Sequence, residues 1–270
     1  MSTQNLTSFS FDGLIWKVIP DEVNHLLVVE YRNSDKHHAD FSAIDLKKKK
    51  IKWQGIKKNE PWWVGLEAVK DGYIYLHGFK DIQNPEHRGI ISVSSDSGKV
   101  MWEEKVLSFG GVFSEGILAL QNEEEENKVY FLLDLKTGKQ KKEYSDVEVL
   151  KKLNQVFREK QKSNIQNALH FTQESEYFPK LSEYVHEVTG EKTSLAFDYA
   201  EYKNFIIISY YIYSDNKLQN LLLIANEEGE VLLKEILDKS PKGVGMDTFF
   251  LLENAVIFVK EKKELIIYEL

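Results

Sequence analysis

The sequence predicts an all-β protein, and the architecture that fits best is a β-propeller of five four-stranded blades. One observation is a hairpin that recurs as SAIDLKKKKIKW, SVSSDSGKVMW, LLDLKTGKQKK and LIANEEGEVLL, an apolar strand that ends in a polar turn and resumes. The other is that short alternating strands, separated by turn residues, fill most of the 270 residues. Antiparallel hairpins repeated at intervals of tens of residues are typical of propellers.

The four hairpins align on their turns. The equivalent turn positions are Lys49, Gly98, Gly138 and Gly229. Four residues further on, the first two copies carry Trp53 and Trp102, whereas the last two carry Lys142 and Leu233. The tryptophan is therefore an imperfect signature of the repeat.

Predicted strands fill the first half of the chain in three groups of four. The first group is 14–19, 25–32, 40–46 and 51–55, the second is 62–69, 73–79, 89–95 and 100–106, and the third is 108–113, 117–121, 129–135 and 139–144. Turn residues such as Pro20 and Gly72 separate the strands of each group. Each group is the size of one propeller blade.

A helical insertion is predicted at about 146–169, within an inserted segment that runs to 194. Val147, Leu150, Leu153 and Phe157 recur there at near-helical spacing on a polar background. The following stretch, 171–195, remains open between a hairpin around Thr189 and irregular chain that covers the helix.

The remaining strands predict a fourth complete blade and an incomplete fifth. They are 195–202, 205–213, 218–225 and 231–237, followed by 246–252, 255–260 and 264–269. The N-terminal segment 6–11 is expected to complete the last blade, because terminal pairing removes exposed sheet edges. The similarity of 11–16 to the repeated turn leaves open that the N-terminus contributes two strands. Six blades is the alternative if 184–197 forms an additional hairpin. The prediction is a single propeller domain over 1–270.

Composition limits the classes of partner and chemistry. The 35 Lys plus Arg residues against 43 Asp plus Glu give a formal charge of −8, which opposes binding to nucleic acid or to anionic membranes. The absence of cysteine excludes disulfides, thiolate nucleophiles and cysteine-ligated zinc. The sequence has neither a signal-peptide pattern nor a run of roughly 18 apolar residues, so a cytoplasmic protein is expected.

Several segments of the first hundred residues together resemble a known family. They are LIWK at 14–17, EYR at 30–32, FSAIDL at 41–46, PWWVGLE at 61–67, HGF at 77–79 and PEHRG at 85–89. The resemblance is to an uncharacterised bacterial propeller-like family, a domain of unknown function found mainly in Bacteroidetes. It implies a propeller-type fold and a bacterial origin, and it supplies no activity and no catalytic residues.

The repeated hairpin itself, with Asp-Leu-Lys-Thr-Gly-Lys in its third copy, resembles the repeat of pyrroloquinoline-quinone-type propellers. That resemblance implies quinone enzymes that are exported and that use calcium and often adjacent cysteines. This chain has no cysteine and no export signal in its printed sequence. A shared fold does not carry a shared site, so no quinone and no other cofactor is expected.

The densest group of unusual polar and aromatic residues lies between positions 30 and 88. Its members are Glu30, Arg32, Trp62, Trp63, Glu67, His77, Asp81, Glu86 and His87. Strand alternation places Trp63, Gly65 and Glu67 on one face of their strand. One interpretation is a polar ligand at one end of the channel, with Trp63 as a stacking platform and hydrogen bonds from Glu67, Arg32 and His77.

The other interpretation is structural: Glu30, Arg32 and Glu67 form an ion-pair network between blades, and the tryptophans pack. No metal site is assigned, because His37, His38 and His87 are predicted in solvent-exposed loops and no metal-ligand spacing is present. No residue is assigned a catalytic role.

The sequence therefore predicts a non-enzymatic propeller that binds a protein partner or a small polar ligand at one end of its blade ring. The alternative is a carbohydrate-active hydrolase or lyase in which Glu67 and His77 perform acid-base chemistry. A purely structural role is a third candidate.

Overall fold

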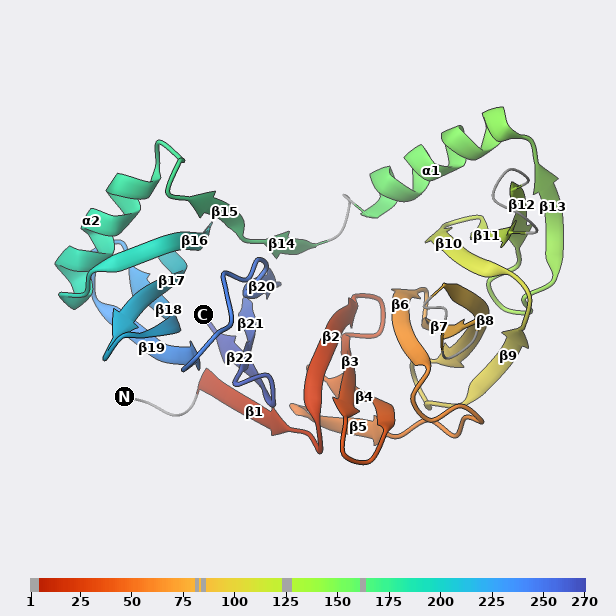
Figure 1. The fold of residues 1–270 in the computed structure, drawn as a ribbon, viewed down its shortest axis with the longest axis horizontal. Coiled ribbons are helices and arrows are strands. Elements are labelled where there is room, and N and C mark those ends of the chain that lie inside the picture. Colours follow the sequence, from red (N-terminus) through yellow and green to blue (C-terminus); the bar gives the residue numbers. More distant parts are fainter. Residues whose placement is uncertain (1–4, 81–82, 84–85, 123–127, 161–163) are drawn as a thin grey trace. The chain divides into compact units, whose positions relative to one another are not determined.

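The computed structural model describes residues 5–80, 83, 86–122, 128–160 and 164–270. The chain forms two compact units, one made of residues 1–11 and 164–270 and the other of residues 12–163. Within the described ranges the strands form five antiparallel sheets, three in the unit 12–163 and two in the other (Figure 1). The predicted all-β class with five sheets is confirmed. The organisation of the chain as one domain stays a prediction.

Three four-stranded sheets follow one another along the unit 12–163. The first is β2 (Leu14–Asp21), β3 (Leu26–Asn33), β4 (His38–Asp45) and β5 (Lys50–Gln54). The second is β6 (Val64–Lys70), β7 (Tyr73–Phe79), β8 (His87–Ser94) and β9 (Val100–Glu104). The third is β10 (Ser108–Phe113), β11 (Gly116–Asn122), β12 (Lys128–Leu133) and β13 (Gln140–Tyr144). Within each sheet the strands lie in chain order, as the three predicted groups require.

The repeated hairpin has a structural reason at its turn. All four aligned turn residues have left-handed backbone conformations: Lys49 (φ 51°), Gly98 (φ 68°), Gly138 (φ 67°) and Gly229 (φ 80°). Glycine adopts this conformation without the steric cost that a side chain imposes. The turn therefore selects for glycine.

The two tryptophans of the repeat join each sheet to the turn of the next one. Trp53 on β5 donates its indole N–H to the carbonyl of Ser95 at 2.7 Å, and Trp102 on β9 donates to the carbonyl of Leu135 at 3.2 Å. A Cβ atom at Gly98 would lie 2.9 Å from the Trp53 ring, and one at Gly138 would lie 2.6 Å from the Trp102 ring. Each turn glycine thus also makes room for the tryptophan of the preceding sheet.

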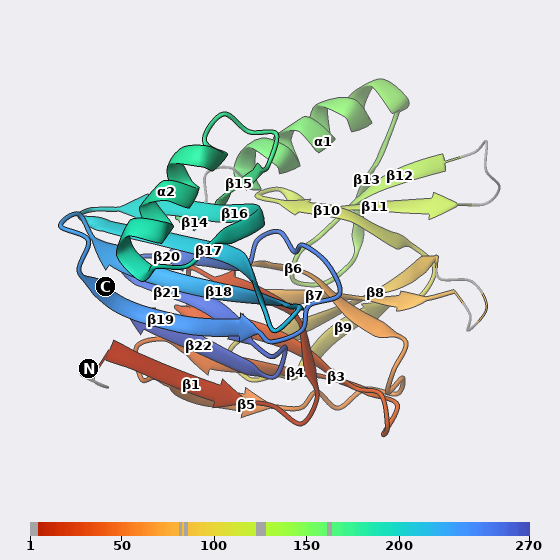
Figure 2. The same ribbon diagram turned by 60° about the vertical axis from the view of Figure 1, so that its left-hand side comes forward.

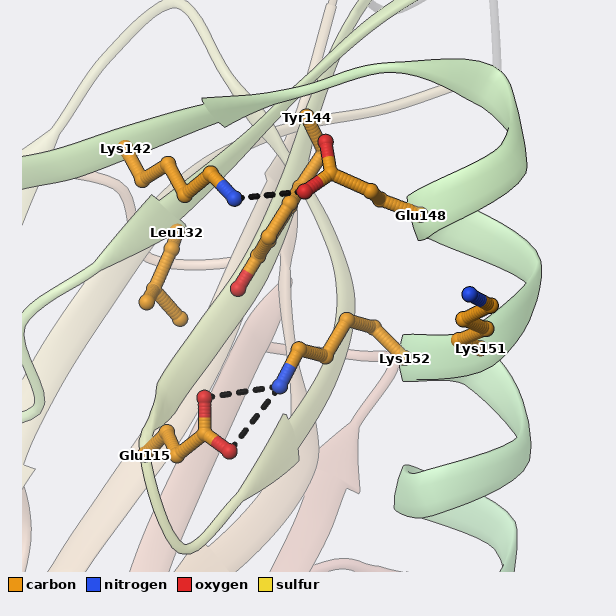
Figure 3. A pocket seen from close by; sticks show the side chains of 7 residues that line it. All are labelled: Glu115, Leu132, Lys142, Tyr144, Glu148, Lys151 and Lys152. Carbon is orange, nitrogen blue, oxygen red and sulfur yellow. Dashed lines mark hydrogen bonds and ion pairs between the residues drawn. The ribbon is translucent and has the colours of Figure 1, made fainter.

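The third hairpin carries Lys142 where the first two carry tryptophan, and this residue contacts a helix. Lys142 on β13 pairs with Glu148 of α1 (Asp146–Lys160) at 2.6 Å. The buried side chain of Val149 and the partly buried Val156 attach α1 to the third sheet. The side chains of α1 and of the third sheet line an open pocket of about 310 Å³. Figure 3 shows these side chains, among them Lys152 of α1 bound to Glu115.

The predicted helical insertion is confirmed, but its extent was wrong. The helix ends at Lys160, and the chain from Ile165 to Asn167 forms a short strand, β14. Ile165 follows the helix at near-helical spacing, but it is a strand residue that pairs with Leu252. The spacing of apolar residues therefore did not show where the helix ends.

Two five-stranded sheets make up the other unit. One has the order β15 (Leu169–Thr172), β16 (Thr193–Tyr202), β17 (Phe205–Ser214), β18 (Lys217–Asn226) and β19 (Val231–Asp238). The other has the order β1 (Leu6–Ser10), β22 (Glu264–Glu269), β21 (Ala255–Lys260), β20 (Phe249–Leu252) and β14. Neither β14 nor β15 was predicted as a strand.

The two ends of the chain share a sheet. β1 pairs antiparallel with β22, and its register runs from Leu6 opposite Tyr268 to Ser10 opposite Glu264 (Figure 2). This confirms that the N-terminal segment completes the last set of strands. The alternative in which the N-terminus contributes two strands was wrong, because β2 begins the first sheet.

A second helix occupies the stretch that the sequence left open. α2 (Phe178–Thr189) ends at Gly190, whose left-handed conformation (φ 75°) caps it, and its Val185 is fully buried against the sheet. Because residues 184–189 are helical, the additional hairpin that a sixth blade needs is not formed. No helix in the described residues is long and apolar enough to cross a membrane.

Candidate functional site

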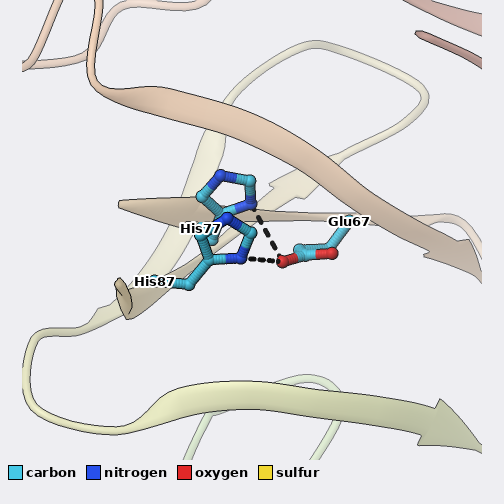
Figure 4. A group of neighbouring side chains, drawn as sticks. All are labelled: Glu67, His77 and His87. Atoms are coloured by element: carbon cyan, nitrogen blue, oxygen red, sulfur yellow. Dashed lines mark hydrogen bonds and ion pairs between the residues drawn. The ribbon is translucent and has the colours of Figure 1, made fainter. Parts of the chain in front are cut away.

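Three side chains from neighbouring strands converge in the second sheet (Figure 4). The Nδ1 atom of His77 on β7 and the Nδ1 atom of His87 on β8 each lie 2.9 Å from the same carboxylate oxygen, Oε1 of Glu67 on β6. The two imidazole rings stack with centroids 3.5 Å apart and planes 8° from parallel. We refer to Glu67, His77 and His87 as the Glu–His–His cluster.

Two β-bulges flank His77 and position its two partners. In β6 the register passes from Leu66 opposite Leu76 directly to Ala68 opposite Tyr75, so Glu67 is the extra residue. In β8 the register likewise skips Gly89, whose φ is 88°. Bulges bend a strand and change the direction of nearby side chains. These bulges place Glu67 and His87 around His77.

A glycine and an aromatic group hold the His77 ring. A Cβ atom at Gly65 would lie 2.6 Å from Cε1 of His77, so the ring fits only over a residue without a side chain. Phe79 contacts both imidazoles edge to face, with centroids 5.0 Å from His77 and 5.2 Å from His87, and the ring centroid of Trp63 lies 5.6 Å from that of Phe79. The Glu–His–His cluster is therefore bounded by an aromatic wall.

The cluster opens to solvent at one residue. The side chain of His87 is 45% exposed, compared with 18% for Glu67 and 9% for His77. His77 Nδ1 is buried, and among the described residues it has no hydrogen-bond partner of acceptable geometry despite its closeness to Glu67. By contrast, His87 Nδ1 and Glu67 form a hydrogen bond. A buried nitrogen without a partner destabilises the fold, because its lost hydrogen bonds to water are not replaced.

The charge on Glu67 is favoured in spite of its partial burial. Burial raises the pKa of Glu67, but the close approach and charge of His77 together with the charges of His87 and Lys17 outweigh it and hold the pKa below its ordinary value. Lys17 lies nearby because its ammonium donates to the backbone carbonyl of Leu66 at 2.8 Å. The cluster thus presents a carboxylate beside two imidazoles.

Glu30 and Arg32 form a separate, structural group. Glu30 is 1% exposed; its Oε1 accepts from Arg32 Nε at 2.6 Å and its Oε2 accepts from the backbone N–H of Leu66 at 2.7 Å. Arg32 also donates to the carbonyl of Val64 at 2.7 Å and lies 5.4 Å from the Trp62 ring. These contacts join β3 to β6. The carboxylate of Glu30 and the guanidinium of Arg32 bond to each other and to the backbone of β6, and these bonds hold the first and second sheets together.

The structure therefore divides the predicted candidates into two groups. It brings Trp63, Glu67, His77 and His87 together, and it places Glu30, Arg32 and Trp62 in the contact between the first and second sheets. Asp81 lies outside the described residues. Whether any of these residues binds a ligand stays a prediction.

The sequence placed His87 among the candidate residues but did not predict its contacts with Glu67 and His77. His87 was predicted in a solvent-exposed loop, but it is the first residue of β8 and contacts Glu67 and His77. The donor atoms of the Glu–His–His cluster lie within 4.8 Å of one another although they come from three strands. Ligands that come from three different strands have no fixed spacing in the sequence, and for this reason no metal site was assigned.

Residues 20–102 match the family model described as "Domain of unknown function (DUF4905)". The DUF4905 match covers less than half of the chain, and it contains the entire Glu–His–His cluster and the Glu30–Arg32 pair. It also covers most of the segments on which the family resemblance was based. The resemblance to a domain of unknown function is thus confirmed, and the match assigns no activity.

None of the curated proteins matches this chain. Solved structures that are similar include BamB from Moraxella catarrhalis, with 8% identity and a TM-score of 0.36 over 96% of this chain and 86% of that one. The Cps50 (Swd1) β-propeller domain of Myceliophteria thermophila has 11% identity and a TM-score of 0.30 over 94% and 65% of the two chains. An endo-arabinase from Bacteroides thetaiotaomicron has 10% identity and a TM-score of 0.29, and the match covers 97% of this chain and 95% of that one. Likeness at this level carries no conclusion about activity.

Proposed function

We propose that this chain is a non-enzymatic, propeller-type binding protein that holds a small polar ligand at the Glu–His–His cluster. The observation that carries the proposal is the convergence of two histidine Nδ1 atoms on one oxygen of Glu67. The group offers a carboxylate acceptor and imidazole donors side by side. Trp63 and Phe79 add an aromatic surface beside it, which suits a ligand that has both hydroxyl groups and an apolar face.

In this proposal the five sheets are the five blades of one propeller. Two observations support it. β1 from the start of the chain completes the sheet formed by β20, β21 and β22 from its end. Within the unit 12–163, Trp53 and Trp102 join successive sheets by the same contact, as expected for repeated blades.

The test is thermal unfolding in the presence of EDTA with a panel of defined small molecules: monosaccharides, dicarboxylates, amino acids and inorganic phosphate. A ligand at about 100 times its Kd stabilises a protein by about 2.7 kcal/mol. We expect at least one class to raise the Tm of the natural chain, and Glu67→Gln and Trp63→Ala to abolish the increase. Trp16→Ala is the matched control, since Trp16 is 69% exposed. A panel without effect, or an increase that persists in Glu67→Gln, contradicts the proposal.

A second candidate, a carbohydrate-active enzyme, is favoured by the same 2.9 Å approach of His77 to Glu67. Glycoside hydrolysis by the usual mechanisms needs a second carboxylate. Glu30, which also contacts β6, is buried and bound to Arg32 and to the Leu66 N–H, so it is not available. Release of reducing ends from a panel of polysaccharides, lost in both Glu67→Gln and His77→Gln, would establish the enzyme over the binding protein.

A further inference from the structure

We propose that the Glu–His–His cluster binds one divalent transition-metal ion, with Zn²⁺ as the best fit. This inference goes beyond the proposed binding function, because it adds a metal ion at the same cluster. Two imidazole nitrogens and one carboxylate are a known set of three protein ligands for catalytic zinc, in which a fourth position stays open to water or to another ligand. The same donors disfavour Ca²⁺ and Mg²⁺, which take oxygen ligands.

The separations of the donor atoms fit one metal ion. Ligands that bind zinc at about 2.1 Å lie about 3.0 Å apart when their bonds are at right angles, and somewhat further apart in a tetrahedron. Each histidine Nδ1 is 2.9 Å from Glu67 Oε1, and the cluster's donor atoms all lie within 4.8 Å of one another. The three donor atoms are therefore close enough to share one ion.

The buried Nδ1 of His77 is the independent observation that points to a ligand. The His77 side chain is 91% buried, and this nitrogen has no hydrogen-bond partner of acceptable geometry among the described residues. An orphaned buried polar atom in a native fold calls for an ion or a water to satisfy it. A metal ion on the Glu67 side satisfies His77 Nδ1 and shares the charge of the carboxylate.

The cluster has one rigid ligand and one adaptable ligand. Gly65 and Phe79 confine the His77 ring, whereas His87 is 45% exposed at the start of β8. A metal ion lies in the plane of an imidazole that binds it, so the parallel rings cannot both bind as they stand. His87 therefore tilts out of the stack when the ion binds, and its exposure permits this movement.

Metal binding at these atoms also releases protons. A histidine binds a metal through a neutral nitrogen, and the ion displaces any proton on Nδ1. Affinity for Zn²⁺ should accordingly fall as the pH decreases, because protons compete with the ion for these nitrogens.

The test is calorimetric titration of the full chain, without an affinity tag, with Zn²⁺ and with Co²⁺, the latter also followed by its visible absorption spectrum. Loss of groups that merely support a metal ligand weakens affinity 10–100-fold. We therefore expect Glu67→Gln and His87→Gln each to weaken Zn²⁺ binding by about 100-fold or more. His87→Gln is decisive because the side chain is exposed and its loss leaves the core intact.

The matched control is the double variant His37→Gln/His38→Gln, which removes two consecutive histidines that are not part of the cluster. We expect one Zn²⁺ per chain, an affinity unchanged in this control, and no binding of Ca²⁺ or Mg²⁺. Zn²⁺ binding that is absent, that survives His87→Gln, or that is lost in the control overturns the metal assignment. A small molecule that binds in EDTA while Zn²⁺ does not bind overturns this inference alone and leaves the proposed function standing.

Discussion

The contact between a turn glycine and the tryptophan of the preceding sheet makes a quantitative prediction for Gly138→Ala. The substitution has two costs. The left-handed backbone at Gly138 costs an alanine about 1–2 kcal/mol. The new Cβ atom, 2.6 Å from the Trp102 ring, adds the cost of overpacking, about 1–3 kcal/mol. We expect Gly138→Ala to lower the free energy of unfolding by about 2–5 kcal/mol.

Gly55→Ala is the matched control in the same unit. Gly55 has a left-handed backbone (φ 83°), but the nearest atoms to its added Cβ are Asp40 carboxylate oxygens at 3.8 and 3.9 Å, an ordinary contact distance. Its cost should therefore be the backbone part alone, about 1–2 kcal/mol. The difference between the two variants measures the contact with Trp102.

The assay is urea unfolding followed by far-UV circular dichroism, which does not depend on the tryptophan signal. In a Trp102→Ala background the ring is gone, and the cost of Gly138→Ala should fall to that of Gly55→Ala. Equal costs for Gly138→Ala and Gly55→Ala in the natural chain, or a cost for Gly138→Ala that Trp102→Ala leaves unchanged, would refute the contact as the basis of the repeat.

Three further predictions follow from buried or charged groups. Glu30→Gln should lower the free energy of unfolding in urea by about 1.5–3 kcal/mol, because a hydrogen bond to a charged group is lost. The buried N–H of Leu66 and the Nε–H of Arg32 then compete for the one amide oxygen that remains. No measurable loss would refute the structural role of Glu30. Hydrogen bonds and the nearby Lys141 lower the pKa of Asp134 from 3.8 to about 2, so Asp134→Asn should be less stable than the natural chain above pH 4, and the gap should close as the pH falls toward 2; a gap independent of pH would contradict this. Phe9→Ala, which empties a buried position of β1, should cost about 3–5 kcal/mol, while the exposed Ser8→Ala should cost nothing measurable; equal effects would show that β1 does not pack as described.

Strands and turns were predictable because their signals are local. A continuous apolar and aromatic run marks strands such as β17, and the turn positions Gly98 and Gly138 are visible in an alignment of the chain with itself. β14 and β15 have only three and four residues, which is too few for a period of two to stand out. The sequence could therefore reveal the repeat but not the additional edge strands.

The second helix had a readable signal that went unused. Phe178, Leu181, Val185 and Val188 recur at helical spacing, Pro179 stands in the first turn and Gly190 follows the last residue. The sequence YVHEVTGEKTSLAF also fits a hairpin around the same glycine, because a left-handed glycine serves both a turn and a helix end. Only the packing of Val185 against Phe197 decides between the two.

The candidate site was predictable in its residues but not in its arrangement. Alternation placed Glu67 with Gly65 and Trp63, and the contacts of these residues with His77 and Phe79 agree with that face. The approach of His87 depends on the two bulges and on the pairing of β7 with β8. These are properties of strand register, which no single strand's sequence contains.

The most direct test of the Glu–His–His cluster as a metal site is the anomalous scattering of a Zn²⁺-loaded crystal, measured at the zinc absorption edge. We predict one anomalous peak at about 2.0–2.2 Å from Glu67 Oε1 and from the Nδ1 atoms of His77 and His87. A peak at His37 and His38 instead, or density without any peak at the cluster, would contradict the assignment.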